Sequence, residues 1–289
     1  MVDFSFIIVT FNSDQLIKDA IDSIVQYEYE SLSSFEIIIV DHSSHEKHQV
    51  LLKVLQEHCY YSRLNIVHNP DNPGYGAGNN AGIKLAAGKF IAIFNPDVRL
   101  TEPLLDIVWD IYRKNSDLGL LGFKQIGGEN LSFYRKPEWN FFLSGWYMKI
   151  MNKLSVFNYR KDFLSGAFFF LDRDKFMNSD LFDENIFMYN EEADISNRLL
   201  KNNILITFNA NHSYLHLINN RPFSSDAYLN EMKSLKYYLK KFSINKEYIV
   251  KLYLKELKFK IFIARLFKKH EAENRFKTMI AHIKTVFNS

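Results

Sequence analysis

Four short apolar runs, separated by segments of helical character, constrain the fold of the N-terminal third of this chain. The runs are Phe4–Val9, Phe35–Val40, Leu64–Val67 and Phe90–Phe94. Each is continuously apolar, which is typical of strands covered on both faces in a parallel sheet. Between them, apolar spacing predicts helices at Asp14–Tyr27, Val50–Cys59 and Ala77–Ala87. We therefore expect an α/β fold with a mostly parallel central sheet flanked by helices.

Polar residues follow each of these strands directly. They are Thr10-Phe11-Asn12, Asp41-His42-Ser43-Ser44, the segment 69–74 and Asn95-Pro96-Asp97. Ligands of open α/β sheets bind beyond the carboxyl ends of the strands. We expect all four groups to converge on one crevice.

Composition excludes a disordered or disulfide-framed chain. Hydrophobic residues make up 47% of the 289 residues, which provides enough apolar surface for a sizeable core. Cys59 is the one cysteine, so we expect a reducing compartment and a small core residue at this position. The N-terminus lacks the basic start of a signal peptide, and no apolar stretch approaches the roughly 20 residues that span a bilayer. These features predict a cytoplasmic protein.

The charge divides the chain near Arg221. Residues 221–289 hold 16 Lys and Arg but only 6 Asp and Glu, so this part is basic. Residues 1–220 hold 20 Lys and Arg and 27 Asp and Glu, so that part is acidic. Before this boundary, Phe163–Leu171 is an apolar run and Ile204–Phe208 resembles a strand; beyond it the pattern is helical. The segment Tyr248–Lys269 reads as a basic amphipathic helix, which predicts either contact with an anionic membrane surface or ordinary packing, including a homodimer contact. No nucleic-acid motif accompanies the charge.

Two acids at strand ends have the chemistry of a nucleotide site. A divalent cation bound to a diphosphate takes one or two protein carboxylates, which suits Asp97. Asp41, followed by Ser43, suits hydrogen bonding to a ribose or a base. A plain turn at Asp97 and a helix cap at Asp41 are the alternatives.

The segment 72–82 contains four glycines, which allow a nucleotide or phosphate to approach the backbone closely. It also matches the loose G-x-G-x-x-G/A pattern at Gly76–Ala81. We reject a nicotinamide-cofactor site there, because the pattern does not lie directly between the first strand and its helix.

Three carboxylates, those of Glu191, Glu192 and Asp194, lie at the predicted start of a helix. A helix N-terminus stabilises ionised carboxylates, which suits a general base; simple capping is the alternative. Asp194 and Arg198 are spaced for an i,i+4 ion pair, which favours a structural role. His216 follows a predicted strand and would complete a metal site begun by Asp97.

Six motifs in order resemble glycosyltransferase family 2 proteins with the GT-A fold, in particular the rhamnosyltransferase-like branch of bacterial polysaccharide synthesis. They are FSFIIVTFN, IIIVDHSS, NPGYGAGNNAGI, FNPDV, FLSGAFFFLDRDKF and FMYNEEADISNRL. The resemblance covers about residues 4–220. It implies a GT-A nucleotide-diphospho-sugar transferase domain at 1–220 and leaves 221–289 as a basic, aromatic-rich helical extension.

The resemblance also implies roles for individual residues. Asp97, with His216, would bind a divalent cation, Mg²⁺ or Mn²⁺. Glu192 would be the base, with Glu191 and Asp194 as alternatives. The donor-binding residues would be Thr10, Phe11, Asn12, Asp41, Ser43, Asn72, Gly74, Tyr75, Asn80 and Asn95. Two positions depart from the family pattern: His42 replaces an asparagine, and Glu192 replaces an aspartate.

The resulting hypothesis is an inverting glycosyltransferase that moves a sugar from a nucleoside-diphosphate sugar to a hydroxyl group. The resemblance points to dTDP-rhamnose or a UDP-sugar as the donor. It implies a growing surface polysaccharide or a polyprenyl-linked glycan as the acceptor, and hence peripheral contact with the cytoplasmic face of the plasma membrane. The alternative is a catalytically silent sugar-nucleotide-binding or scaffolding subunit of a polysaccharide assembly complex.

Overall fold

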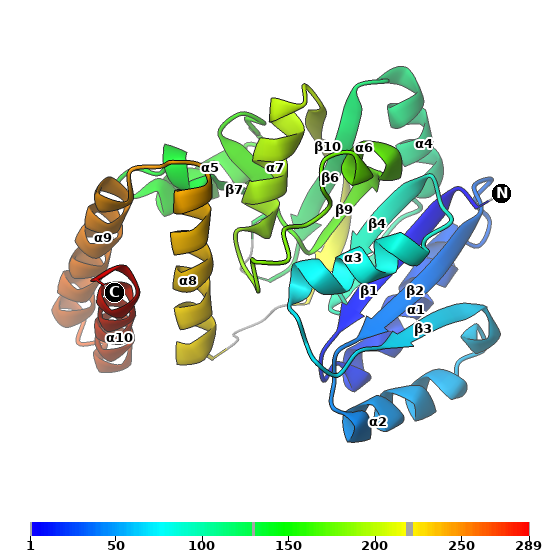
Figure 1. Ribbon diagram of the computed structural model, residues 1–289, viewed down its shortest axis with the longest axis horizontal. Coiled ribbons are helices and arrows are strands. Elements are labelled where there is room, and N and C mark those ends of the chain that lie inside the picture. The colour runs from blue at the N-terminus through cyan, green and yellow to red at the C-terminus, as the bar shows by residue number, and fades with distance from the viewer. Residues whose placement is uncertain (1, 129–130, 218–221, 289) are drawn as a thin grey trace.

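The computed structural model describes residues 2–128, 131–217 and 222–288 and centres on a sheet of eight strands (Figure 1). The strand order is β3-β2-β1-β4-β9-β6-β10-β5. The bounds are β1 Phe4–Thr10, β2 Phe35–Asp41, β3 Leu64–His68, β4 Phe90–Phe94, β5 Val98–Leu100, β6 Leu118–Ile126, β9 Phe168–Asp172 and β10 Leu205–His216. Strands β3, β2, β1 and β4 are parallel, as are β6 and β10, whereas β9 and β5 are antiparallel to their neighbours. The expected α/β architecture is confirmed.

Helices cover both faces of this sheet, and the strand residues alternate between two cores. On β1, Phe6 and Ile8 pack into one cluster and Ile7 into the other, which explains why the run is apolar throughout. The first face carries α1 (Asp14–Glu28), α2 (His45–Gln56) and α4 (Leu105–Lys114). The second carries α3 (Tyr75–Leu85), α5 (Ser144–Lys153), α6 (Arg173–Met177) and α7 (Glu191–Lys201). A small sheet pairs β7 (Phe133–Arg135) with β8 (Asp162–Leu164), and short 3₁₀ turns lie at Tyr61–Arg63 and Pro137–Trp139.

Three C-terminal helices pack against the α7 side of the molecule, at the end opposite α2 and β3 (Figure 1). They are α8 (Ser225–Lys241), α9 (Lys246–Leu266) and α10 (His270–Asn288). Their apolar residues form a third cluster that includes Ala193 of α7. The boundary expected near Arg221 lies in 218–221, outside the described residues. We propose that the extension forms a continuous unit with the sheet-containing part.

Ion pairs fasten the extension to the segment that precedes α7. The Lys241 ammonium lies 2.6 Å from a carboxylate oxygen of Asp183 and 2.5 Å from one of Asp194. Although burial lowers it, the pKa of Lys241 is raised overall by these two carboxylates. One side chain at the end of α8 thus connects the extension to the start of α7.

Several sequence-based expectations need correction. The apolar run Phe163–Leu171, to which no element was assigned, contributes to two strands, β8 and β9, which Ser165-Gly166-Ala167 separates. The strand expected at Ile204–Phe208 continues to His216 as β10, through a register shift between Asn209 and Ser213. Cys59 is exposed and not part of the core, because α2 ends at Gln56 and Cys59 lies in the turn that follows.

Within the described residues, the structure holds no helix that is both long enough and apolar enough to cross a bilayer.

We expect Lys241→Met to lower the free energy of unfolding by about 1–2 kcal/mol, because it leaves the buried Asp194 with one cation fewer. Guanidinium unfolding monitored by circular dichroism measures this change. The matched control is Lys240→Met, whose side chain is exposed on the same helix and should shift stability by less than about 0.5 kcal/mol. Equal effects of the two substitutions would contradict the fastening role.

Candidate active site

A cavity of about 470 Å³ lies where the carboxyl ends of β4 and β10 meet the start of α7. Its lining includes Asn95, Glu191, Glu192 and His216, together with Tyr75. Residues separated by more than a hundred positions in the sequence therefore share one space. Of the four polar groups expected to share one crevice, Asn95 is the member that lines this cavity, which lies at the edge of the sheet where α/β proteins bind ligands. The convergence of all four groups stays a prediction.

Asp97 and His216 lie against each other at this edge. His216 is the last residue of β10 and pairs with Val98 of β5, while the Leu217 amide donates to the Asp97 carbonyl at 2.9 Å. This backbone pairing brings His216 Nε2 to 3.3 Å from a carboxylate oxygen of Asp97. Both side chains are buried. Neither ring nitrogen of His216 makes a hydrogen bond with the described part of the chain.

The first turn of α7 carries Glu191 and Glu192 into the cavity. Tyr189 and Asn190, immediately before it, both have φ of 70°, which turns the chain sharply into the helix. Burial raises the pKa of Glu192 to about 7. Burial, and then repulsion from Glu192 and Asp194, raise the pKa of Glu191 well above its usual value. A carboxyl group with a pKa near neutrality is suited to accepting a proton at physiological pH.

Asp194 does not take part in this cavity. It is fully buried, and Arg198 holds it with Nε at 2.8 Å and Nη2 at 2.7 Å, while Lys241 holds its other oxygen. Arg198 also donates to the carbonyl groups of Ser179 and Leu181. The i,i+4 pair of Asp194 with Arg198 is confirmed. Asp194 as the base stays a prediction that these contacts do not favour.

Gly166 allows Glu192 to reach its position. A Cβ atom at residue 166 would overlap the Glu192 carboxylate, so only glycine leaves room for it. The Tyr75 hydroxyl lies 2.7 Å from the Gly166 carbonyl oxygen and 2.9 Å from Asn95 Oδ1. The cavity wall thus combines α3, the end of β4 and the loop between β8 and β9.

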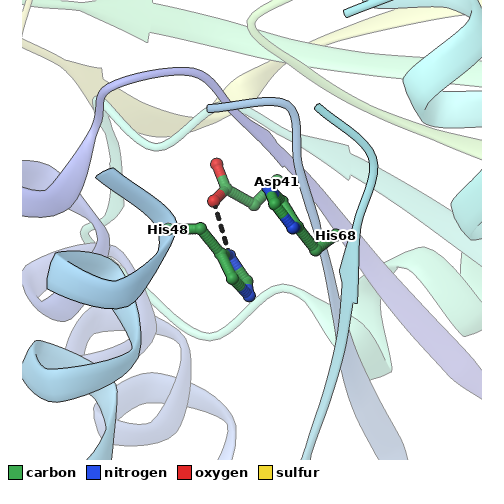
Figure 2. Close-up of side chains that lie close together, drawn as sticks. All are labelled: Asp41, His48 and His68. Atoms are coloured by element: carbon green, nitrogen blue, oxygen red, sulfur yellow. Dashed lines mark hydrogen bonds and ion pairs between the residues drawn. The ribbon is translucent and has the colours of Figure 1, made fainter. Parts of the chain in front are cut away.

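Asp41 lies outside the lining of this cavity, in a hydrogen-bond network of its own (Figure 2). One carboxylate oxygen accepts from Thr10 Oγ1 at 2.8 Å and Ser43 Oγ at 2.6 Å, and the other lies 2.8 Å from His48 Nδ1. Burial alone would raise the pKa of Asp41, but these hydrogen bonds hold it below its usual value. Ser43 Oγ also accepts from the backbone N–H of Asn12 at 2.8 Å. Asp41 therefore fixes the loops after β1 and β2.

His48 and His68 extend this network, as Figure 2 shows, but their geometry does not suit a metal ion. Ligand atoms of Asp41, His48 and His68 lie within 4.8 Å of one another. The two imidazole rings are stacked, with centroids 3.8 Å apart and planes at 4°. An imidazole nitrogen directs its lone pair in the plane of its ring, and no ion lies in two parallel planes at once. The rings would have to unstack before they could share a metal.

The remaining predicted donor-binding residues have different environments. Phe11 and Asn12 are exposed beside the Asp41 network, and Asn72 is half-buried. Gly74 has φ of 107° and begins α3 against the Phe187 backbone, which leaves no room for a Cβ atom. The Asn80 side-chain Nδ2 donates to the Phe182 carbonyl and to Glu184 Oε1. Its Oδ1 accepts from the Phe182 backbone N–H. These bonds hold the segment before α7, and a contact of Asn80 with the donor stays a prediction.

Sequence reasoning did not identify several residues of the site. Tyr134, Tyr189 and Glu231 line the cavity, and His48 supports Asp41. Tyr189 lies within the motif FMYNEEADISNRL, but no role was assigned to it. Tyr134 and Glu231 lie outside the six motifs, on β7 and on α8 of the basic extension. His48 lies seven residues after Asp41, on the helix that the strand leads into, and this proximity was the available signal.

Comparison with known proteins adds to this geometry. Residues 5–179 match the family described as glycosyl transferase family 2. Poly(ribitol-phosphate) β-N-acetylglucosaminyltransferase TarS of Staphylococcus aureus is 26% identical over 135 residues, which are 45% of this chain and 22% of TarS. Low-salt glycan biosynthesis hexosyltransferase Agl10 of Haloferax volcanii is 22% identical over 211 residues, which are 71% of this chain and 64% of Agl10.

Solved structures share the fold. Mannosyltransferase PcManGT from Pyrobaculum calidifontis, in complex with GDP-Man and Mn²⁺, superposes with a TM-score of 0.65 at 12% identity, over 98% of this chain and 86% of that one. The structure of residues 1–349 of S. aureus TarS in complex with UDP-GlcNAc superposes with a TM-score of 0.56 at 17% identity. The superposition covers 89% of this chain and 72% of that one.

The match with TarS spans less than a quarter of that protein. The family match, in contrast, covers more than half of this chain and includes β2, which ends at Asp41, and the turn between β4 and β5 that carries Asp97. The chain belongs to glycosyl transferase family 2 and has the GT-A fold.

Proposed function

We propose that this protein transfers a sugar from a nucleoside-diphosphate sugar to a hydroxyl group of a glycan acceptor, with inversion at the anomeric carbon. The observation that carries the proposal is the shared cavity, which holds Glu192 and His216, the latter in contact with Asp97. The named relatives include an N-acetylglucosaminyltransferase and a hexosyltransferase of glycan biosynthesis. Two of the similar structures contain UDP-GlcNAc and GDP-Man, which supports a donor of this class.

Asp97 and His216 fit a divalent cation. His216 is buried with both ring nitrogens lacking hydrogen bonds, which is costly unless another group completes them. A carboxylate and an imidazole are suitable ligands for Mn²⁺, and a carboxylate for Mg²⁺. When bound, such a cation offsets the charge that develops on the departing diphosphate. PcManGT was solved with Mn²⁺, which agrees with this assignment.

Glu192 is the proposed base. It takes the proton of the acceptor hydroxyl as the acceptor oxygen bonds to the anomeric carbon and the bond from that carbon to the diphosphate oxygen breaks. A single displacement of this kind inverts the anomeric configuration. Glu191 is more deeply buried than Glu192, and burial, followed by repulsion from Glu192 and Asp194, raises its pKa. Glu191 is the alternative base, and Glu192 is preferred because its carboxylate lies against Gly166 in the cavity wall.

The donor pocket extends from this cavity toward the loops that Asp41 holds. In this arrangement Asn95 and Tyr75 border the diphosphate, and the exposed Phe11 and Asn12 lie toward the nucleoside. Thr10, Asp41 and Ser43 act through the backbone they hold, since they satisfy one another's hydrogen bonds. The donor candidates remain dTDP-rhamnose and the UDP-sugars.

We expect Asp97→Asn to abolish the extra thermal stabilisation that Mn²⁺ gives to the UDP-bound protein. A ligand at a hundred times its Kd stabilises a protein by about 2.7 kcal/mol, which is several degrees in Tm. Thermal shift with UDP, UDP-GlcNAc, GDP-mannose and dTDP-rhamnose, each with and without Mn²⁺, measures this. Asp71→Asn, an exposed acid in the loop before α3, serves as the control. An unchanged Mn²⁺ effect in Asp97→Asn would contradict the metal assignment.

We expect Glu192→Gln to lower kcat by about 10²–10⁴-fold, because the amide cannot accept the proton, while donor binding persists. The wild-type rate should fall about tenfold per pH unit below about pH 7, as the carboxylate becomes protonated. The variant should lose this acidic limb. A coupled assay for released nucleoside diphosphate measures both, and Glu57→Gln, exposed after α2, is the control.

Gly166→Ala should also lower kcat, since the added methyl group displaces the Glu192 carboxylate. A full rate in Glu192→Gln would remove Glu192 from the mechanism. Tight donor binding by the wild type, with no transfer to any acceptor from a cell extract, would instead favour the scaffolding subunit.

We also propose that α9 contacts an anionic membrane surface. Phe259, Phe262 and Leu266 form an exposed stripe along this helix at i, i+3 and i+7. Exposed Lys255 and Lys258 lie beside them. Apolar residues flanked by lysines are the chemistry that binds the headgroup region of anionic lipids. Such a position would bring the cavity near a polyprenyl-linked acceptor.

Cosedimentation with vesicles of phosphatidylcholine, with and without phosphatidylglycerol, tests this contact. The wild type should bind the anionic vesicles preferentially, and Phe262→Ser with Leu266→Ser should weaken binding about tenfold or more. Leu32→Ser, at a fully exposed leucine distant from α9, is the control. Equal sedimentation of wild type and double variant would contradict the proposal.

A further inference from the structure

A second cavity, of about 520 Å³, lies between α8, α9 and the turn before α7. Tyr189 and Glu231 line both this cavity and the one that holds Glu192. The two spaces therefore adjoin through these side chains. A ligand that reaches Glu192 from this side would extend into the C-terminal helices, away from the loops at Asp41.

The Glu231 carboxylate is without a partner among the residues that the structure describes. This half-buried carboxylate makes no hydrogen bond or ion pair with residues 2–128, 131–217 or 222–288. Burial raises its pKa to about 7. The hydroxyl group of Tyr228, one turn earlier on α8, is buried and also without a hydrogen bond in the described part of the chain. Buried polar groups in native proteins are nearly always satisfied, so the Tyr228 hydroxyl indicates a missing partner. The half-buried Glu231 carboxylate lies beside it at the surface of the cavity, where a ligand can reach it.

The rest of the lining indicates what kind of partner fits. Aromatic walls come from Tyr189, Phe223 and Tyr253. One oxygen of Glu256 already accepts from the Leu143 backbone N–H at 2.7 Å, and Lys260 is the single cation among the lining residues that the structure describes. A diphosphate would face two carboxylates against one ammonium, which is unfavourable. A sugar ring has apolar C–H faces for the aromatic rings and hydroxyl donors for a carboxylate.

We infer that this cavity is a subsite for a sugar unit of the acceptor glycan, with the Tyr189 ring as its platform and the Glu231 carboxylate as the acceptor of its hydroxyl hydrogen bonds. The inference rests on the proposed function, since it takes Glu192 as the point of transfer. Glu231 binds and positions the acceptor, and Glu192 receives the proton. The extension therefore contributes part of the substrate site as well as a surface for the membrane.

The test measures saccharide binding directly, without turnover. Saturation-transfer NMR is recorded with methyl glycosides of glucose, galactose, mannose, rhamnose and N-acetylglucosamine, on the full chain with UDP and Mn²⁺ present. We expect at least one glycoside to bind, and Glu231→Gln to raise its Kd about tenfold, as for loss of a hydrogen bond to a charged group. Tyr189→Ala should weaken binding similarly, whereas Tyr189→Phe retains the ring and should retain most of the affinity. Glu247→Gln, exposed on α9, is the control.

The outcomes separate this inference from the proposed function. The stabilisation by UDP and Mn²⁺ should be the same in all these variants, because none of them touches Asp97. If no glycoside binds the wild type, or if Glu231→Gln and Tyr189→Ala bind as tightly as the wild type, the subsite is overturned even where donor turnover is normal. If glycoside binding depends on Glu231 but the protein turns over no sugar nucleotide, the subsite is supported and the proposed transferase activity is contradicted.

Discussion

The buried ion pair between Asp194 and Arg198 holds the first turns of α7 against the chain that leads into the helix, and the site depends on that position. Arg198 uses its remaining donors on the carbonyl groups of Ser179 and Leu181, so the helix is fixed to the chain that leads into it. Lys241 adds a link from α8 to the same aspartate. Breaking a buried pair of this kind is costly because it leaves a charge without compensation. Glu191 and Glu192, at the start of this helix, therefore have a defined position relative to the strand ends.

Burial then gives these acids their chemistry. An exposed glutamate has a pKa near 4.3 and is a weak base. In the cavity, desolvation raises the pKa of Glu192 to about 7, where proton transfer at neutral pH is most effective. Gly166 makes this burial possible because it leaves space for the carboxylate. The same environment leaves both ring nitrogens of His216 without a hydrogen bond to the described residues, so the proposed base and the proposed metal ligand line one cavity.

We propose two roles for the C-terminal helices, one at the acceptor site and one at a membrane surface. Their charge suggested an anionic surface, and the exposed stripe on α9 is consistent with that proposal. Their inner side, however, packs on Ala193 and brings Glu231 to the edge of the cavity that holds Glu192. One face of the extension thus serves the acceptor site that we infer, and another remains available to a membrane. Net charge alone did not distinguish these two uses of the same helices.

The sequence by itself determined the four parallel strands, the helix start at Glu191 and the family, because continuous apolar runs and short ordered motifs are local signals. It also indicated that Asp194 pairs with Arg198, since that contact is set by helical spacing. The tertiary structure decided what depends on contacts between distant segments. The β9 strand inserts antiparallel between β4 and β6. The Asn80 side chain bonds to Phe182 and Glu184, and the Asp41 carboxylate bonds to Thr10, Ser43 and His48. A side chain's residue type shows what it can bond to, but only packing decides which of those bonds are already made and which remain for a substrate.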